Sequence, residues 1–186
     1  ENVIKKRVEF LTAYQDAAYA ARYETLVASV RQAETAQGLG NKLSTAVAKY
    51  YFKLMAYKDE YEVARLHMDK AFHAKVNDMF EGEFTLRYHL APPLWAQKND
   101  RGELQKSSFG PWMRWAFKAL APLKVLRGGA LDVFGYSEER RQERGLIQAY
   151  RVAVESLLPK LTSANREAAA AFARVPEQIR GFGHVK

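Results

Sequence analysis

The chain has 186 residues, of which 48% are hydrophobic and 27% charged, a composition typical of a folded domain rather than a disordered segment. Lysine and arginine number 29 against 21 aspartates and glutamates, giving a net charge of +8, and there is no cysteine. This excludes disulfides, thiolate zinc sites, cysteine-ligated clusters and cysteine nucleophiles, and no apolar run is long enough to predict a membrane span.

Two long helical patterns occupy the first 80 residues. Apolar residues recur at three- and four-residue steps from Ile4 onward and predict a helix over 2–35, which the glycine turn at 38–40 ends. A second pattern predicts a helix over 42–79, with a break within it left open, that packs antiparallel to the first. Four of its residues are expected to be buried against the first helix: Tyr50, Leu54, Tyr57 and Tyr61.

The middle of the chain predicts a small β hairpin around 84–97. Phe84, Leu86, Tyr88 and Leu90 alternate with polar residues, as in a strand with one buried face. The two prolines that follow end this strand. The segment 94–97 is the expected facing strand.

Three more helices are predicted in the last third, over 111–121, 137–159 and 163–174. Ser137 is the expected N-cap of the second, and Thr162 or Ser163 of the third. Periodicity places Trp112 and Trp115 with Ala119 and Leu123 on one core-facing stripe, and turns Leu146 inward. The predicted fold is therefore a single, mostly α domain, an antiparallel helical bundle with a small β hairpin in the middle.

No residue qualifies as catalytic, cofactor-binding or metal-ligating from the sequence. His67 and His73 are six residues apart on different helix faces, and a metal site joining His89 to His184 is less favoured than structural roles for both. Phosphate-loop and G-x-S-x-G patterns are absent. The acidic pairs near 59–62 and at 138–139 are interpreted as solvated faces or first-turn capping charges.

Two groups of residues are candidates for binding. The bases Lys5, Lys6, Arg7, Lys124, Arg127, Arg140, Arg141 and Arg144 could line one face for nucleic acid, although the aromatic residues are better explained as core. A membrane-surface helix is disfavoured, because no predicted helix joins a basic face to an uncommitted apolar one. The second group is a docking segment near the C-terminus, whose alternative is a frayed end: Arg180, Phe182, His184 and Lys186.

Six segments carry a resemblance to a known family. They are KKRVEFLTAYQDAAYA (5–20), YYFKLMAYKDEYEVARL (50–66), YHLAPPL (88–94), FGPWM (109–113), LRGGALDVFGYSEERRQER (126–144) and PEQIRGFGHVK (176–186). Together they resemble the C-terminal region of the long, single-chain indolepyruvate ferredoxin oxidoreductases. Since the chain starts at Glu1 rather than Met, we expect residues 1–186 to be one helical accessory domain of a longer polypeptide.

The resemblance implies a parent enzyme that decarboxylates aryl pyruvates on thiamine diphosphate, reduces ferredoxin through iron–sulfur clusters and forms acyl-CoA. No catalytic role is assigned to the matched region, and this sequence lacks both cysteine and a Gly-Asp-Gly stretch for magnesium-bound thiamine diphosphate. We therefore expect no cofactor and no activity in this fragment.

The expected role of the fragment is structural support or docking in a cytoplasmic enzyme. Its expected partners are other domains of the same polypeptide or a second copy, with ferredoxin reached through the parent. The alternative is an independent basic helical module that binds nucleic acid or an acidic protein.

Overall fold

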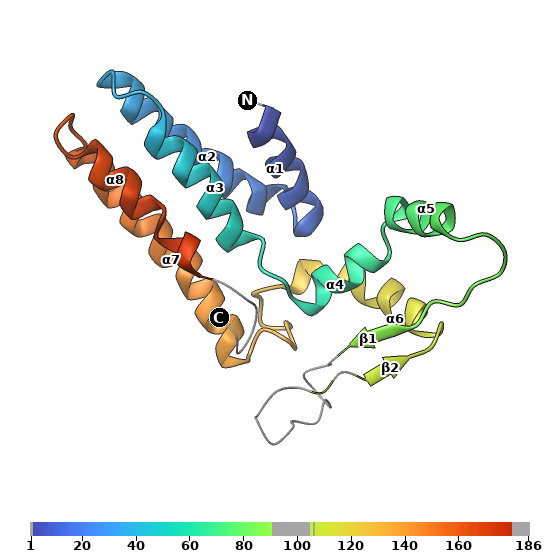
Figure 1. Cartoon of the computed structure of the whole chain (residues 1–186). Helices are drawn as coiled ribbons and strands as arrows, with labels where there is room; N and C mark the ends of the chain where they lie inside the picture. Colours follow the sequence, from blue (N-terminus) through green and yellow to red (C-terminus); the bar gives the residue numbers. More distant parts are fainter. Residues whose placement is uncertain (1, 91–104, 106, 180–186) are drawn as a thin grey trace. The chain divides into compact units, whose positions relative to one another are not determined.

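The computed structural model describes residues 2–90, 105 and 107–179, and these are mostly helical with one small two-stranded sheet (Figure 1). This confirms the predicted mostly α class with a hairpin in the middle. The chain divides into two compact units, one formed by 1–58 with 125–186 and the other by 59–124. Within the described ranges, no helix is both long and apolar enough to cross a membrane.

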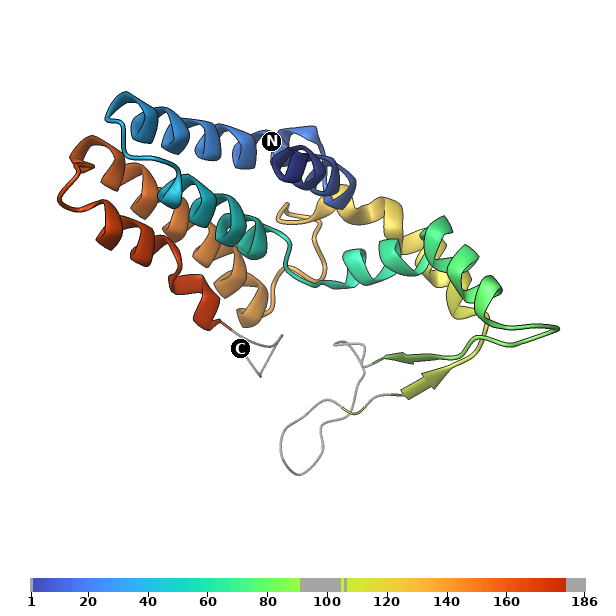
Figure 2. The same cartoon turned by 45° about the horizontal axis from the view of Figure 1, so that its top comes forward.

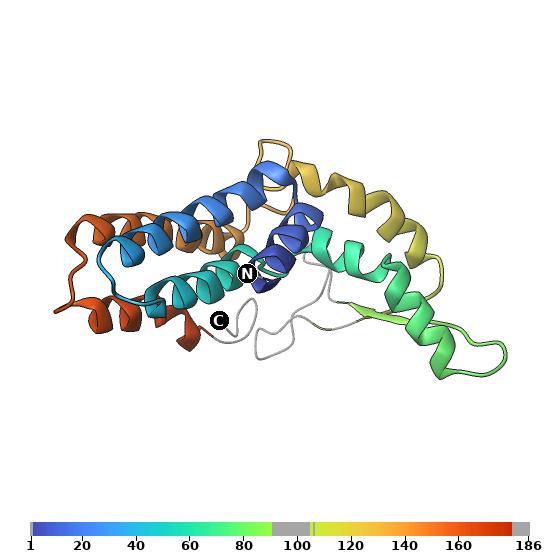
Figure 3. The ribbon, with the colours of Figure 1, turned by 90° about the horizontal axis from the view of Figure 1, so that it is seen from above.

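The first unit is an antiparallel helical bundle. Its elements are α1 (Asn2–Tyr14), α2 (Ala17–Ala36), α3 (Lys42–Met55), α7 (Glu138–Leu157), η2 (Leu158–Lys160), α8 (Arg166–Ala173) and η3 (Val175–Gln178). Helix α3 is central, because it packs against α2, α7 and α8 (Figures 1 and 3). The short turn after α2 reverses the chain into α3, as the glycine pattern predicts (Figure 2).

Tyrosines form much of the core of this bundle. The ring of Tyr51 stacks on Tyr23 and on Tyr150, with centroid separations of 6.3 and 5.9 Å. The Tyr23 hydroxyl donates to the Ala48 carbonyl and that of Tyr150 to the Ala173 carbonyl, so their polar atoms are satisfied while the rings are buried. The burial expected for four residues along the second pattern is confirmed, although Tyr61 lies in the second unit rather than in this bundle: Tyr50, Leu54, Tyr57 and Tyr61.

The two long predicted helices are each interrupted, and an aspartate caps every restart. Asp16 separates α1 from α2 and accepts a 2.7 Å bond from the Tyr19 amide. Asp59 caps α4 (Glu60–His67) and Asp69 caps α5 (Lys70–Met79) in the same way. The prediction of one helix over 2–35 is therefore wrong, and the break left open within 42–79 occurs at two places. An aspartate carboxylate satisfies the free amides of each new helix start.

A buried glutamate caps α3 from the preceding helix. The two carboxylate oxygens of Glu34 accept bonds of 2.7 and 3.0 Å from the amides of Leu43 and Ser44. Asn41, the N-cap residue by position, makes no side-chain capping bond. A carboxylate at a helix N-terminus is favoured by both hydrogen bonding and the helix dipole, so Glu34 fixes the turn between α2 and α3.

Replacing Glu34 by glutamine is expected to lower the free energy of unfolding by about 1–3 kcal/mol, because one charged acceptor becomes an amide donor facing backbone N–H groups. Urea denaturation measures this. The matched control is Glu24→Gln, at an exposed position of the same helix, where the change should stay within about 0.5 kcal/mol. Equal losses in the two variants would contradict a capping role for Glu34.

The second unit contains α4, α5, the hairpin and α6 (Met113–Leu120), which η1 (Ala121–Leu126) follows. Strands β1 (Tyr88–Leu90) and β2 (Ser107–Phe109) pair antiparallel, with Tyr88 opposite Phe109. The facing strand is thus 107–109, and the segment 94–97 expected in that role lies outside the described residues. Phe84 and Leu86 precede β1 without strand structure, so the predicted strand is too long at its start.

Helix α6 turns a different face to the core than the periodicity indicates. Met113 and Phe117 are buried with Ala64 of α4 and Tyr88 of β1. Trp112 and Trp115 are 59% and 72% exposed, so the prediction that both tryptophans are core residues is wrong. The predicted end of this helix near Pro122 is confirmed, because the chain continues there as η1.

The last helices follow their predictions with two exceptions. Ser137 caps α7 as expected, accepting a bond from the Arg140 amide. Leu146 is exposed rather than turned inward, since Tyr150 and Val154 form the buried face of α7. Helix α8 begins after Asn165, not after Thr162 or Ser163, and the Asn165 side chain accepts from the Thr162 amide to close the preceding turn.

Candidate functional site

Arg127 is the centre of a buried polar cluster in the first unit. Its Nη1 donates a 2.6 Å bond to the Tyr14 carbonyl, and its guanidinium lies 3.7 Å from the centre of the Tyr14 ring. The Tyr14 hydroxyl in turn donates to the Tyr57 carbonyl at 2.7 Å. Arg127 and Tyr14 thereby connect three parts of the unit: the end of α1, the segment after α3 and the loop before α7.

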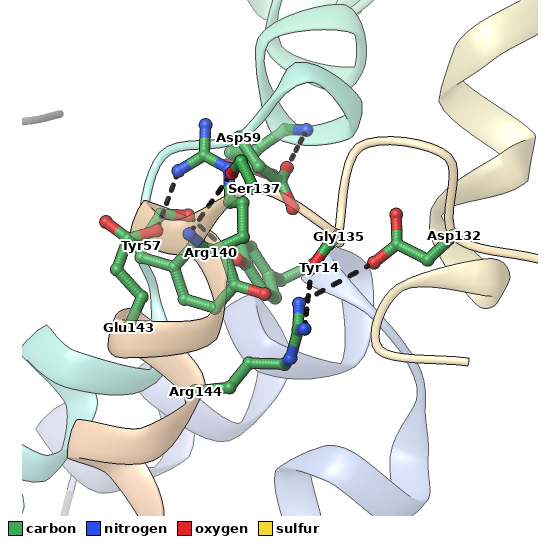
Figure 4. Close-up of polar contacts among 10 residues, drawn as sticks. Tyr14, Tyr57, Asp59, Asp132, Gly135, Ser137, Arg140, Glu143 and Arg144 are labelled. Atoms are coloured by element: carbon green, nitrogen blue, oxygen red, sulfur yellow. Dashed lines mark hydrogen bonds and ion pairs between the residues drawn. The ribbon is translucent and has the colours of Figure 1, made fainter. Parts of the chain in front are cut away.

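The loop 127–137 is fixed by a second set of contacts, around Arg144 (Figure 4). Arg144 donates a 2.7 Å bond to the Gly135 carbonyl and lies 3.9 Å from the Asp132 carboxylate, which also accepts from the Gly128 amide. A Cβ atom on Gly135 would clash with that carboxylate, so a larger residue there would force the Asp132 side chain to move. On α7 itself, Arg140 pairs with Glu143 at 2.7 Å.

These contacts change the interpretation of the basic residues. Arg127, Arg140 and Arg144 all make interactions inside the first unit. These three side chains therefore contribute little to the basic face with Lys5 and Lys6 that the sequence raised as the less favoured possibility. A guanidinium that is held against carbonyl, carboxylate and aromatic partners inside the protein is not available to a phosphate backbone.

The acidic residues and histidines have structural roles as well. Asp59 and Glu62 are buried rather than solvated, Asp59 as the cap of α4 and Glu62 in an ion pair with Arg65 at 2.7 Å. Glu138 and Glu139 lie exposed in the first turn of α7, as predicted. His67 stacks on Phe117 with ring centres 4.8 Å apart.

The described part of the chain contains no group of three histidines, aspartates or glutamates that could hold a metal ion. His73 contacts the His67 carbonyl, and His89 is exposed on β1. The predicted docking segment lies outside the described residues, as does the remaining histidine: Arg180, Phe182, His184 and Lys186.

Two surface features were missed by sequence reasoning. The first is the exposed face of α6, formed by Trp112, Trp115 and Lys118, with the Lys118 amine 5.4 Å from the centre of the Trp115 ring. We call it the α6 tryptophan face. The second is a pocket of about 300 Å³ between α1, α2 and α3, with three cations among its lining residues: Arg7, Arg31 and Lys49.

The comparisons with known proteins give one match. A family model, described as a family of unknown function (DUF6537), matches residues 1–186. No curated protein and no solved structure matches the chain. Because the family model spans both compact units, the chain belongs to the family DUF6537.

Proposed function

We propose that this chain is a non-catalytic C-terminal module of an indolepyruvate ferredoxin oxidoreductase, and that it supports the enzyme by docking onto another domain of the same polypeptide. Thiamine diphosphate, magnesium and iron–sulfur clusters belong to the other domains of this cytoplasmic parent. One line of support is the resemblance of six segments distributed along the chain. The other is that the buried polar clusters around Arg127 and Arg144 form hydrogen bonds within the protein itself.

The observation that carries the docking role is the α6 tryptophan face. Trp112 and Trp115 are more than half exposed, whereas Met113 and Phe117 of the same helix are buried. Large exposed aromatic side chains are enriched where proteins bind one another, because burying each one removes much apolar area from water. Covering this face with a second protein surface would therefore lower the free energy of the resulting complex.

The charge around this face indicates the chemistry of the surface that covers it. No aspartate or glutamate occurs between Glu103 and Asp132, while Arg114 and Lys118 are exposed on α6. Complementary charge sets the register of an interface more than its affinity. We therefore expect an apolar contact for the tryptophans, bordered by carboxylates of the neighbouring domain.

The test is the parent enzyme carrying Trp112→Ser and Trp115→Ser. In the 186-residue chain alone, the free energy of unfolding should change by no more than about 0.5 kcal/mol, because both side chains are already exposed. In the parent, the module should become sensitive to limited proteolysis, and oxidation of indolepyruvate with coenzyme A and a viologen dye should fall.

The matched control is Val152→Ser with Phe172→Ser, which removes two exposed apolar side chains from α7 and α8. These two substitutions should leave the protease resistance and the indolepyruvate oxidation of the parent unchanged. If both double variants behave alike, the α6 tryptophan face is not the docking surface. If the parent lacking residues 1–186 still assembles and turns over normally, the accessory role itself is wrong.

The second candidate function is that of an independent module that binds an acidic protein or nucleic acid. The exposed cations of α6 favour this candidate. Binding to nucleic acid weakens steeply with salt, in proportion to the number of phosphates contacted. A fluorescent single-stranded oligonucleotide titrated into the 186-residue chain at low and at physiological ionic strength tests this candidate. Saturable, salt-sensitive binding that Trp115→Ser removes would favour it over docking within the parent.

A further inference from the structure

The pocket between the first three helices is built from residues far apart in the sequence. Its lining includes Ile4 and Arg7 of α1, Val27 and Arg31 of α2, and Ala48 and Lys49 of α3. All of these residues belong to the first unit. The pocket volume of about 300 Å³ is at the lower end of the range for small-molecule pockets, which commonly form between the helices of a bundle.

The lining divides into an apolar part and a cationic part. Val27 and Ala48 are buried, and Ile4 is half-buried beside them. Arg31 and Lys49 are exposed, while Arg7 is half-buried with its guanidinium 5.3 Å from the centre of the Phe52 ring. Among the described residues, none of the three cations forms an ion pair with a carboxylate.

The buried acid next to this region does not neutralise the cations. Both carboxylate oxygens of Glu34 accept backbone bonds from the first turn of α3. Glu34 is also absent from the pocket lining. The pocket lining therefore combines apolar side chains with three cations, and it includes no acidic side chain.

We propose that this pocket binds a small amphipathic anion, a carboxylate joined to a short hydrocarbon body. The planar guanidinium of Arg7 matches a carboxylate in geometry, and Phe52 holds it in place. Arg31 and Lys49 add attraction from the rim, while Ile4, Val27 and Ala48 accept the hydrocarbon. This binding is independent of the α6 tryptophan face and stands whether or not that face docks a domain.

The probe is hexanoate, titrated into the 186-residue chain and followed by the methyl NMR signals of Ile4, Val27 and Ala48. The expected result is a saturable shift of these signals, with a dissociation constant on the order of millimolar for so small a ligand. The uncharged analogue 1-hexanol should bind at least about fivefold more weakly, because it gains nothing from the cations. Absence of saturation with hexanoate, or equal affinity for 1-hexanol, overturns the proposal.

Variants separate the local cations from the net charge of the protein. Arg31→Gln with Lys49→Gln should weaken hexanoate binding about threefold or more and leave 1-hexanol unaffected. The control, Lys5→Gln with Lys6→Gln, removes the same charge from exposed positions of α1 that do not line the pocket. Equal weakening in both pairs would show a general charge effect and overturn the site. Since all four side chains are exposed, the variants are expected to fold, which their NMR spectra verify.

Discussion

Replacing Arg127 by methionine is expected to lower the free energy of unfolding by about 2–4 kcal/mol. Tyr14 is the last residue of α1, where helix carbonyls need partners from outside the helix. Arg127 supplies such a partner through a 2.6 Å bond and places its charge over the Tyr14 ring. Methionine fills similar volume but donates nothing, which takes a charged donor away from a buried carbonyl and removes the cation–π contact.

The control for this experiment is Arg151→Met on α7. Arg151 forms a 3.8 Å ion pair with Glu155, and both side chains are well exposed to solvent. Exposed pairs of this kind contribute less than about 0.5 kcal/mol. Urea denaturation of the two variants measures the difference directly. Similar losses would mean that Arg127 stabilises the protein no more than a surface arginine does.

Periodicity predicted the helical class and the buried seam of α3, but it did not locate the helix breaks. The helical spacing of apolar residues continues past Asp16, Asp59 and Asp69. Hydrophobic spacing alone therefore predicts continuous helix at these three positions. The signal was nevertheless present. Aspartate is a preferred N-cap, and Glu62 stands three residues after Asp59, the spacing of a capping box. Hydrogen bonds from an aspartate carboxylate to nearby backbone amides compete with continuation of the helix. In this chain a new helix starts at all three aspartates.

The orientation of α6 shows what periodicity leaves open. The helix carries two apolar stripes, one with Trp112 and Trp115 and another with Met113 and Phe117. Both stripes have helical spacing, so the sequence alone does not rank them. The second stripe is buried because Ala64 and Tyr88 pack against it. The choice between the stripes is thus made by tertiary contacts.

The candidate sites were the least predictable part of the molecule. The Arg127 cluster joins residues 113 positions apart, as the bond from Arg127 to Tyr14 shows. The pocket likewise takes Arg7, Arg31 and Lys49 from three different helices. No local motif marks such a set, because the residues meet only when the helices pack. Sequence reasoning recognised the basic residues but could not separate those that pair internally from those that remain available.

The tyrosine core predicts a marked loss of stability at high pH. Burial raises the pKa of Tyr19 and of Tyr150 well above the usual tyrosine value, and it raises the pKa of Tyr23 and Tyr51 in the same direction. These phenols therefore stay neutral in the folded protein when the same side chains in the unfolded chain have lost a proton. Above a pH of about 10 the unfolded state binds fewer protons than the folded state, so stability falls as pH rises.

The expected size of this loss follows from proton linkage. The contribution is fully present below a pH of about 10 and decreases by about 1.4 kcal/mol per pH unit above it for each strongly shifted tyrosine. Tyr19 and Tyr150 together should therefore lower the free energy of unfolding by about 3 kcal/mol at a pH of about 11. Tyr23 and Tyr51 should add to this loss. Urea denaturation at a pH of about 8 and again at about 11 measures the difference.

Tyr150→Phe distinguishes this mechanism from general alkaline damage. At a pH of about 8 the variant should be about 1 kcal/mol less stable than the natural chain, because the bond from the hydroxyl to the Ala173 carbonyl is lost. At a pH of about 11 it should be equally or more stable, because phenylalanine has no proton to lose on unfolding. Tyr136→Phe is the control, since it removes the same hydroxyl group from a ring that is 63% exposed. A constant difference between Tyr150→Phe and the natural chain at both pH values would show that the buried phenol does not govern alkaline unfolding.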